Sequence, residues 1–90
     1  MKVEIITPDK VVYSGAASLV RVPGAKGSFE ILDMHAAIIS ALEEGELFVK
    51  ADDGNNHTYF IDAGVVEVLE NRVIILAESI SKTNNLASPK

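Results

Sequence analysis

The sequence predicts a single all-β domain, and three features of the chain favour this fold class. Its 90 residues are enough for one hydrophobic core and too few for two. Short apolar runs separated by turn residues recur about every 8–12 positions, which is the spacing typical of a sandwich or a barrel. Within most of these runs apolar and polar side chains alternate, as they do in a strand with one buried face.

Three expected strands occupy the first quarter of the chain. The first, residues 2–7, is rich in β-branched side chains, and the turn-forming residues 8–10 end it. A short strand follows at 11–13, and we expect the small residues at 14–15 to stop it. The third strand covers 16–22 and alternates along its length.

A glycine-rich loop, residues 23–27, separates the third strand from the fourth. We expect it to be a flexible hairpin loop, because glycine can take the positive φ that such loops need. The strand that follows places Phe29 and Ile31 on one face.

Residues 34–44 do not fit this scheme on their own. Their apolar side chains stand at helical spacing and several are good helix formers. Taken without context, the segment fits a helix as well as a strand. The β-runs and turns of the remaining sequence favour an all-β fold overall.

The second half adds two strands around the clearest turn of the chain. Apolar side chains alternate with the others in 46–51 and again in 57–63. Between them, Asp-Asp-Gly-Asn-Asn at 52–56 is a strong turn signal.

Two further strands, 65–69 and 73–77, complete the expected sheet structure. Asn71 in the tight link between them tolerates the left-handed conformation that a short hairpin requires. The run 73–76 is apolar on both faces, so we expect it inside the fold rather than at an edge.

From residue 79 onward the chain becomes polar. We therefore predict a domain at 1–80 and a C-terminal tail at 81–90 that is loose unless something docks it.

Composition excludes several classes of function. The net charge is −5, and the eight Lys and Arg residues are scattered, so a nucleic-acid partner is not expected. There is no Cys to form a disulfide or a thiol nucleophile. No apolar run approaches ~18 residues and no signal-peptide layout is present, which predicts a cytoplasmic bacterial chain without direct lipid insertion.

Neither histidine has the partners that catalysis or metal binding requires. His57 stands near Asp52 and Asp53, but local turn chemistry already explains those acids. His35 would need a nucleophile or acid partner, and the sequence offers no recognisable one. Acids beside a turn glycine, such as Glu43 and Glu44, are usually only solvated. We predict no catalytic residue, no metal and no cofactor.

Lys26, in the 23–27 loop, leaves one alternative open. A lipoyl or biotinyl carrier domain is also a small β-fold that presents one lysine at a hairpin tip. The acidic and methionine neighbours that the modifying enzyme of a carrier recognises are absent here. The residues therefore favour a domain that binds partner proteins, with the carrier as the alternative.

Three motifs in a fixed order carry a resemblance that covers roughly residues 2–80. The matching positions are Ile5, Thr7, Pro8, Tyr13 and Gly15; then Gly24, Gly27, Ile31, Leu32, His35, Ala36, Leu42 and Gly45; then Phe60, Gly64, Glu67, Val68, Asn71, Val73, Leu76 and Ala77. In this order and spacing they resemble the epsilon subunit of the F-type ATP synthase, called delta in mitochondria.

The chain departs from that family at a few places. Asp33 and Met34 stand where the family has Pro-Gly, Ala37 replaces the proline after the histidine, and Ala63 replaces the first glycine of a pair. These departures concern the loop near His35 more than the fold.

The resemblance implies a flattened β-sandwich of about ten short, mostly antiparallel strands, in which 38–42 is extended. It implies a non-catalytic rotor subunit of a proton-translocating F-type ATP synthase. Such a subunit joins the central-stalk subunit gamma to the membrane ring and transmits rotation. It would be peripheral, on the cytoplasmic face of the bacterial inner membrane. Most bacterial members continue into two helices, which bind ATP in some of them. No ATP binding is therefore expected of a chain that stops at residue 90.

The resemblance also implies two contact surfaces. The ring-facing edge would comprise Gly24, Ala25, Lys26, Gly27, Ser28 and Glu30. The face toward gamma would comprise Thr7, His35, Ala36, Ile38 and Ser40.

Overall fold

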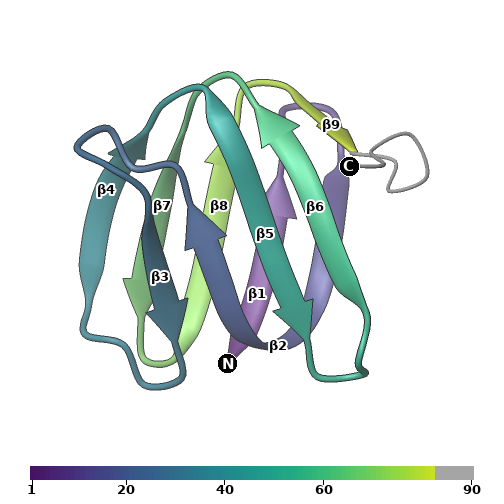
Figure 1. The fold of residues 1–90 in the computed structure, drawn as a ribbon, viewed down its shortest axis with the longest axis vertical. Coiled ribbons are helices and arrows are strands. Elements are labelled where there is room, and N and C mark those ends of the chain that lie inside the picture. Colours follow the sequence, from purple (N-terminus) through teal and green to yellow (C-terminus); the bar gives the residue numbers. More distant parts are fainter. Residues whose placement is uncertain (83–90) are drawn as a thin grey trace.

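The structure, a computed structural model, describes residues 1–82 and consists of two facing β-sheets (Figure 1). The all-β prediction is confirmed, since this range contains nine strands and no helix, and hence no helix that could cross a membrane. The strands are β1 (Lys2–Ile6), β2 (Val11–Val22), β3 (Phe29–Leu32), β4 (Ile38–Leu42), β5 (Gly45–Ala51), β6 (Asn56–Ile61), β7 (Gly64–Leu69), β8 (Arg72–Ala77) and β9 (Ile80–Lys82).

Each layer of the sandwich is a sheet of five strands, with β2 counted in both. The first sheet has the order β4-β7-β8-β1 and ends on the first half of β2. The second contains β3, the second half of β2, β5, β6 and β9. In this part of the chain β1 and β8 run parallel, and the other pairs are antiparallel.

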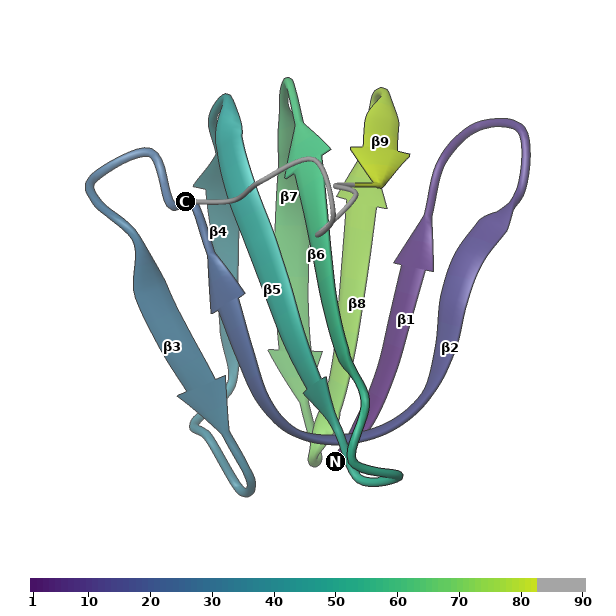
Figure 2. The same ribbon diagram turned by 45° about the vertical axis from the view of Figure 1, so that its right-hand side comes forward.

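Strand β2 passes from one sheet into the other, and Figure 2 shows it curving beneath the sandwich. The prediction that residues 14–15 end a strand is wrong, because Gly15 pairs with Val3 and the ladder continues. Gly15 also leaves room for a neighbour, since a Cβ there would lie 3.0 Å from the hydroxyl oxygen of Tyr13. Beyond it, the register shifts between Ala17 and Leu19, which is a bulge where the strand changes sheets.

The core lies between the two sheets and is made of the inward-facing side chains that alternation predicts. Its fully buried members of largest volume are Ile5, Ile31, Leu47, Ile61 and Ile75. Tyr59, from β6, is also part of this cluster. Phe29, predicted to share a face with Ile31, packs against the same cluster while only partly buried.

Strand β8 lies between β7 and β1, so its predicted interior position in the sheet is confirmed. Its two faces differ, however. Ile75 is fully buried, whereas Leu76 is 52% exposed on the outer side of the sheet. Burial in this domain therefore explains the inward side chains of the apolar run 73–76 and does not explain the outward Leu76.

The helix alternative for residues 34–44 is wrong. Residues 38–42 form β4, whose five positions all pair with β7, as the family resemblance implied. A turn precedes the strand, in which the N–H of His35 donates to the carbonyl of Leu32 at 3.1 Å and Met34 has a positive φ. Sheet pairing and the burial of Leu42 outweigh a helix propensity that amounts to a few tenths of a kcal/mol per residue.

Two predicted turns have the conformations expected of them. Glu70 and Asn71 both have positive φ, 52° and 62°, as a two-residue hairpin requires. The side chain of Asn71 also accepts a hydrogen bond from the N–H of Met34 at 2.8 Å. In the turn after β5, Gly54 has a φ of 93° and Asp53 accepts the N–H of Asn55 at 2.9 Å.

The polar C-terminal stretch begins as ordered sheet. Ile80–Lys82 forms β9, which pairs with β6, and Ile80 packs against the core. The tail was expected to be loose unless something docks it, and residues 80–82 are docked by the free edge of β6, which offers backbone partners. The domain boundary at 80 stays a prediction, and residues 83–90 of the predicted tail lie outside the described residues.

The opposite faces of β8 give a direct test of the fold. We expect Ile75→Ala to lower the free energy of unfolding by about 2–5 kcal/mol, because it leaves a cavity in the core. Leu76→Ala is the matched control, and it should cost less than about 1 kcal/mol, since half of that side chain already meets solvent. Chemical denaturation measures both values. Equal losses would contradict the assignment of the two faces.

Candidate protein-binding surfaces

The outer side of the first sheet carries exposed apolar side chains from β4, β7 and β8 and the half-buried side chain of Ile6 from β1. Strand pairing puts Ala41 beside Val65, Val65 beside Leu76, and Leu76 beside Ile6. This row, together with Ile39 next to it on β4, is called the apolar face below. Ile39 is 74% exposed. A contiguous exposed apolar surface on a sheet is unusual for a domain that works alone and is typical of a protein-binding site.

A groove continues the apolar face at the end of the sheet where β1 and β8 finish. Its volume is ≈ 530 Å³. Three members of the apolar face, Ile6, Val65 and Leu76, form part of its lining together with Thr7 and Pro8. The N–H of Thr7 donates to the carbonyl of Lys10 at 2.9 Å, which holds the rim of the groove in a tight turn.

The hydrogen bond between Asp62 and Ser79 ties together the two chain segments beside this groove. The backbone N–H of Ser79 donates to the carboxylate of Asp62 at 3.2 Å. Hydrogen bonding, chiefly from the side chain of Ser79, lowers the pKa of Asp62 below its ordinary value. Next to this pair, the N–H of Glu78 donates to the carbonyl of Ala63 at 3.0 Å, and both residues line the groove.

The structure distributes the five predicted gamma-contact residues over the two ends and the edge of the first sheet. Thr7 lines the groove at one end. His35 and Ala36 lie in the turn before β4, at the other end, where Nδ1 of His35 stands 2.8 Å from the carbonyl of Ala36. Ile38 and Ser40 are half-buried, and Ile38 packs against the core.

Sequence analysis missed the residues that face outward from this sheet. On β4 these are Ile39 and Ala41, because the buried Leu42 sets the alternation and turns Ile38 and Ser40 the other way. On β7 and β8 the large apolar ones are Val65, Leu69 and Leu76. Counting back from Leu42 in steps of two gives the inward positions on β4, so the positions between them form the outward set.

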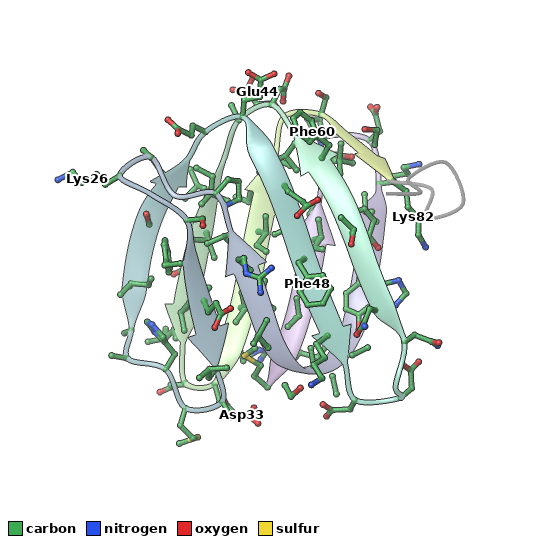
Figure 3. All side chains as sticks on the ribbon, viewed as in Figure 1. Lys26, Asp33, Glu44, Phe48, Phe60 and Lys82 are labelled. Atoms are coloured by element: carbon green, nitrogen blue, oxygen red, sulfur yellow. The ribbon has the colours of Figure 1, made fainter. Side chains whose placement is uncertain are left out.

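The predicted ring-contact residues lie in the loop between β2 and β3, except for Glu30 on β3. Ala25, Lys26, Gly27 and Ser28 are exposed, and Lys26 projects into solvent at the loop tip (Figure 3). Gly24 is buried.

Backbone hydrogen bonds hold this loop against β4. The N–H of Ala25 donates to the carbonyl of Ala41 at 3.0 Å, and the N–H of Glu43 donates to the carbonyl of Pro23 at 2.9 Å. Gly27 has a φ of 122°, as the glycine-rich loop was expected to need. The expected flexible hairpin is thus fastened to the neighbouring sheet.

Glu30 is engaged in a cross-strand ion pair with Arg21 of β2. Its Oε2 accepts from Nη2 at 3.0 Å and from Nε at 3.2 Å. Both side chains are nearly half exposed, so the pair contributes little to stability. The guanidinium also lies over the ring of Phe48, 5.3 Å from its centroid.

His57 lies among aromatic side chains, away from both surfaces. Its ring stands 5.1 Å from that of Tyr13 and 6.4 Å from that of Tyr59, between centroids. Its buried Nδ1 has no hydrogen-bond partner among the described residues. Burial, and then the charges of Asp53 and Asp52, raise the pKa of Tyr13. Residues 1–82 contain no group of three His, Cys, Asp or Glu side chains that could hold a metal ion.

The Asp62–Ser79 contact yields a pH prediction. Replacing Ser79→Ala should raise the pKa of Asp62 toward the ordinary aspartate value of about 3.9, because the side-chain hydrogen bond to the carboxylate is lost. In the parent chain the lowered pKa means that the stabilisation is present above this ordinary value and is lost as the pH falls through the folded-state pKa. NMR titration of the Asp62 carboxyl carbon measures the change. Ser14→Ala, at an exposed site on β2, is the control and should leave that titration unaltered.

Comparison with known proteins gives consistent relatives. Residues 1–83 match the family described as "ATP synthase, Delta/Epsilon chain, beta-sandwich domain". The ATP synthase epsilon chain of Nitratidesulfovibrio vulgaris is 40% identical over 86 residues, which are 96% of this chain and 63% of that protein. The epsilon chain of Chlorobium limicola is 35% identical over 80 residues, 89% of this chain and 91% of that protein. The chain thus spans less than two thirds of the first relative.

A solved structure shares the fold. A chain in the central stalk and c-ring of the Tetrahymena thermophila mitochondrial ATP synthase superposes with a TM-score of 0.76 at 20% sequence identity. The superposition covers 90% of this chain and 65% of that one. The family match includes both sheets, the groove and the loop between β2 and β3. This chain therefore belongs to the ATP synthase delta/epsilon chain family, through the β-sandwich domain of that family.

Proposed function

We propose that this chain is a rotor subunit of a bacterial F-type ATP synthase, which joins the central-stalk subunit gamma to the membrane ring and transmits rotation. Family membership supports this role over the carrier-domain alternative. The observation that carries the proposal is that one packed sandwich presents two separate surfaces, the apolar face and the loop between β2 and β3.

The apolar face is the surface we assign to gamma. A stable protein interface buries roughly 800 Å² per partner and has an apolar centre with a polar rim. The apolar face spans four strands and continues into the groove that contains Thr7. Glu67, paired with Ile39, lies beside it and supplies part of the polar rim.

This assignment favours some of the five predicted gamma-contact residues over others. Thr7, His35 and Ala36 remain in the proposed surface, at its two ends. On β4 the outward side chains of Ile39 and Ala41 are better placed for contact than Ile38 and Ser40, which turn toward the interior.

The loop between β2 and β3 is the surface we assign to the ring. Its exposed residues Ala25, Gly27 and Ser28 are small, so another loop can approach the backbone closely. Lys26 adds one positive charge at the tip. Such a loop suits the polar loops of a membrane ring, which it would meet outside the lipid.

The proposed role is mechanical and non-catalytic. Close packing of the core makes the domain stiff, so that a load at one surface reaches the other with little deformation. No step of this role requires a proton transfer, a cofactor or ATP bound by the described residues. The site of action would be the cytoplasmic face of the bacterial inner membrane, as a peripheral subunit.

The gamma assignment predicts the effect of a charge on the apolar face. We expect Ile39→Asp to weaken binding to purified gamma by at least about tenfold, because it buries a carboxylate against an apolar partner surface. Phe60→Asp is the matched control: Phe60 is 47% exposed on β6, in the other sheet, and its replacement should change the affinity by no more than about twofold. Calorimetric titration measures both constants. Unchanged affinity for the Ile39 variant would remove the assignment.

The ring assignment predicts the effect of reversing charge on the loop. We expect the double variant Lys26→Glu, Ser28→Glu to lower retention of the purified ring by the complex of gamma with this chain at least about tenfold, because it reverses the charge and adds bulk at the tip. The control is Lys50→Glu, Ser81→Glu, which changes the same residue types at exposed sites outside the loop. Full ring retention by the loop variant would rule out this surface.

A further inference from the structure

We propose that the hydrogen-bonded contact between the 23–28 loop and β4, called the junction below, joins the two proposed surfaces into one mechanical unit, with Gly24 as its positioning residue. This inference rests on the proposed function and specifies how the load crosses the domain. It concerns a contact between segments that are adjacent in space and belong to different sheets.

The loop and β4 arise from opposite layers of the sandwich. The loop connects β2 and β3, which pair with each other in the second sheet. Strand β4 is the outer strand of the first sheet and pairs with β7. In Figure 1 the loop between β2 and β3 lies at the same corner of the molecule as the end of β4. Without the junction, the loop would be attached to the second sheet alone.

Two backbone hydrogen bonds make the junction. The N–H of Ala25 donates to the carbonyl of Ala41, and the N–H of Glu43 donates to the carbonyl of Pro23. Between these bonds, Gly24 forms an isolated antiparallel bridge with Leu42. The loop thereby acts as a short extra strand on the edge of β4.

Ala41 belongs to both sides of this connection. Its carbonyl holds the loop, and its side chain is part of the apolar face, beside Val65. A load that enters the domain through the apolar face therefore reaches the loop directly through Ala41 and its hydrogen bond to Ala25, beside the second bond of the junction from Glu43 to Pro23. The other route runs through the core into β2 and β3, and from there along the two stems of the loop.

Glycine is required where the loop meets β4. A Cβ on Gly24 would lie 2.7 Å from the carbonyl oxygen of Gly27 and 2.8 Å from Cε1 of Phe29. The carbonyl is backbone, and Phe29 packs against the core, so neither atom can yield cheaply. The N–H of Gly27 also donates to the carbonyl of Gly24 at 2.9 Å, so displacing Gly24 displaces the exposed tip as well.

A second close approach fixes the start of the loop. A Cβ on Gly45, the first residue of β5, would lie 2.7 Å from Cβ of Pro23. Pro23 and Gly24 are both buried, in contrast to the exposed residues 25–28 that follow. The loop therefore has a fixed base on β4 and an accessible tip, which is the arrangement that force transmission needs.

The experiment uses the assembled synthase with the 90-residue chain in place, and two variants that weaken the junction differently. Gly24→Ala introduces the clash described above. Ala25→Pro, at an exposed position, removes the N–H that donates to Ala41 and puts the proline ring in its place, and it decides the matter if the first variant does not fold. The matched control is Gly54→Ala, which strains the turn after β5, where an added Cβ has nothing within 4 Å.

Four quantities are measured for each variant: affinity for gamma, retention of the ring, exchange of the Glu43 amide, and protons pumped per ATP hydrolysed. Because residues 24 and 25 also belong to the proposed ring surface, the ratio reports on the junction in a variant that retains the ring like the parent chain. We expect both junction variants to bind gamma within about twofold of the parent chain, because the apolar face is unaltered. Exchange of the Glu43 amide should accelerate by at least about tenfold, since its hydrogen bond opens locally. Protons pumped per ATP should fall, while the Gly54 control keeps the parent ratio.

The outcomes separate the inference from the function on which it rests. A parent ratio of protons to ATP in variants whose Glu43 amide exchanges faster would overturn the inference and leave the rotor role in place. Unchanged amide exchange in both variants would also overturn it, because the junction would then not depend on Gly24 or Ala25. Failure of the unaltered chain to bind gamma or the ring would refute the proposed function itself.

Discussion

The continuity of β2 is the constraint on which the rest of the structure depends. Its first half pairs with β1 and its second half with β5 and β3, so one strand sets the register of both sheets. A slip of one residue would turn Val20 and Val22 out of the core and reverse every pair beyond them. The bulge between Ala17 and Leu19 allows the change of sheet without this loss. One continuous strand therefore fixes the position of the two sheets relative to each other.

The side chains of the apolar face do not stabilise this domain by itself, and a partner that covers them would explain their presence. Exposed Ile39 and Leu76 gain nothing from the core of this domain, yet they lie on β4 and β8, the two strands that flank β7 and its exposed Val65. In strands with one solvent-exposed face, the residues on that face are usually polar. Leu76 is also one of the residues that made the run 73–76 resemble a strand buried on both sides. That impression becomes correct if a partner covers the outer side of the first sheet.

Sequence patterns predicted strands wherever alternation and turn residues agreed, as in 46–51, the turn at 52–56 and the Asn71 hairpin. They failed where a long-range partner decided the outcome. Residues 34–44 have helical spacing, but β7 supplies a complete set of backbone partners for 38–42. Ser14 and Gly15 are small, but β1 pairs with them in register. The resemblance located the segments of the candidate site. It did not identify which side chains of β4 face outward.

By itself, the sequence determined the fold class, most strand positions and the glycines that the turns require, because these depend on local alternation and backbone sterics. Tertiary structure alone decided which strands share a sheet, that β2 serves two of them, and that the loop between β2 and β3 is fastened to β4. It also decided which side of the first sheet meets solvent. These features depend on contacts between residues far apart in the chain, and no local pattern encodes the pairing partner of a strand or the atoms that surround Gly24.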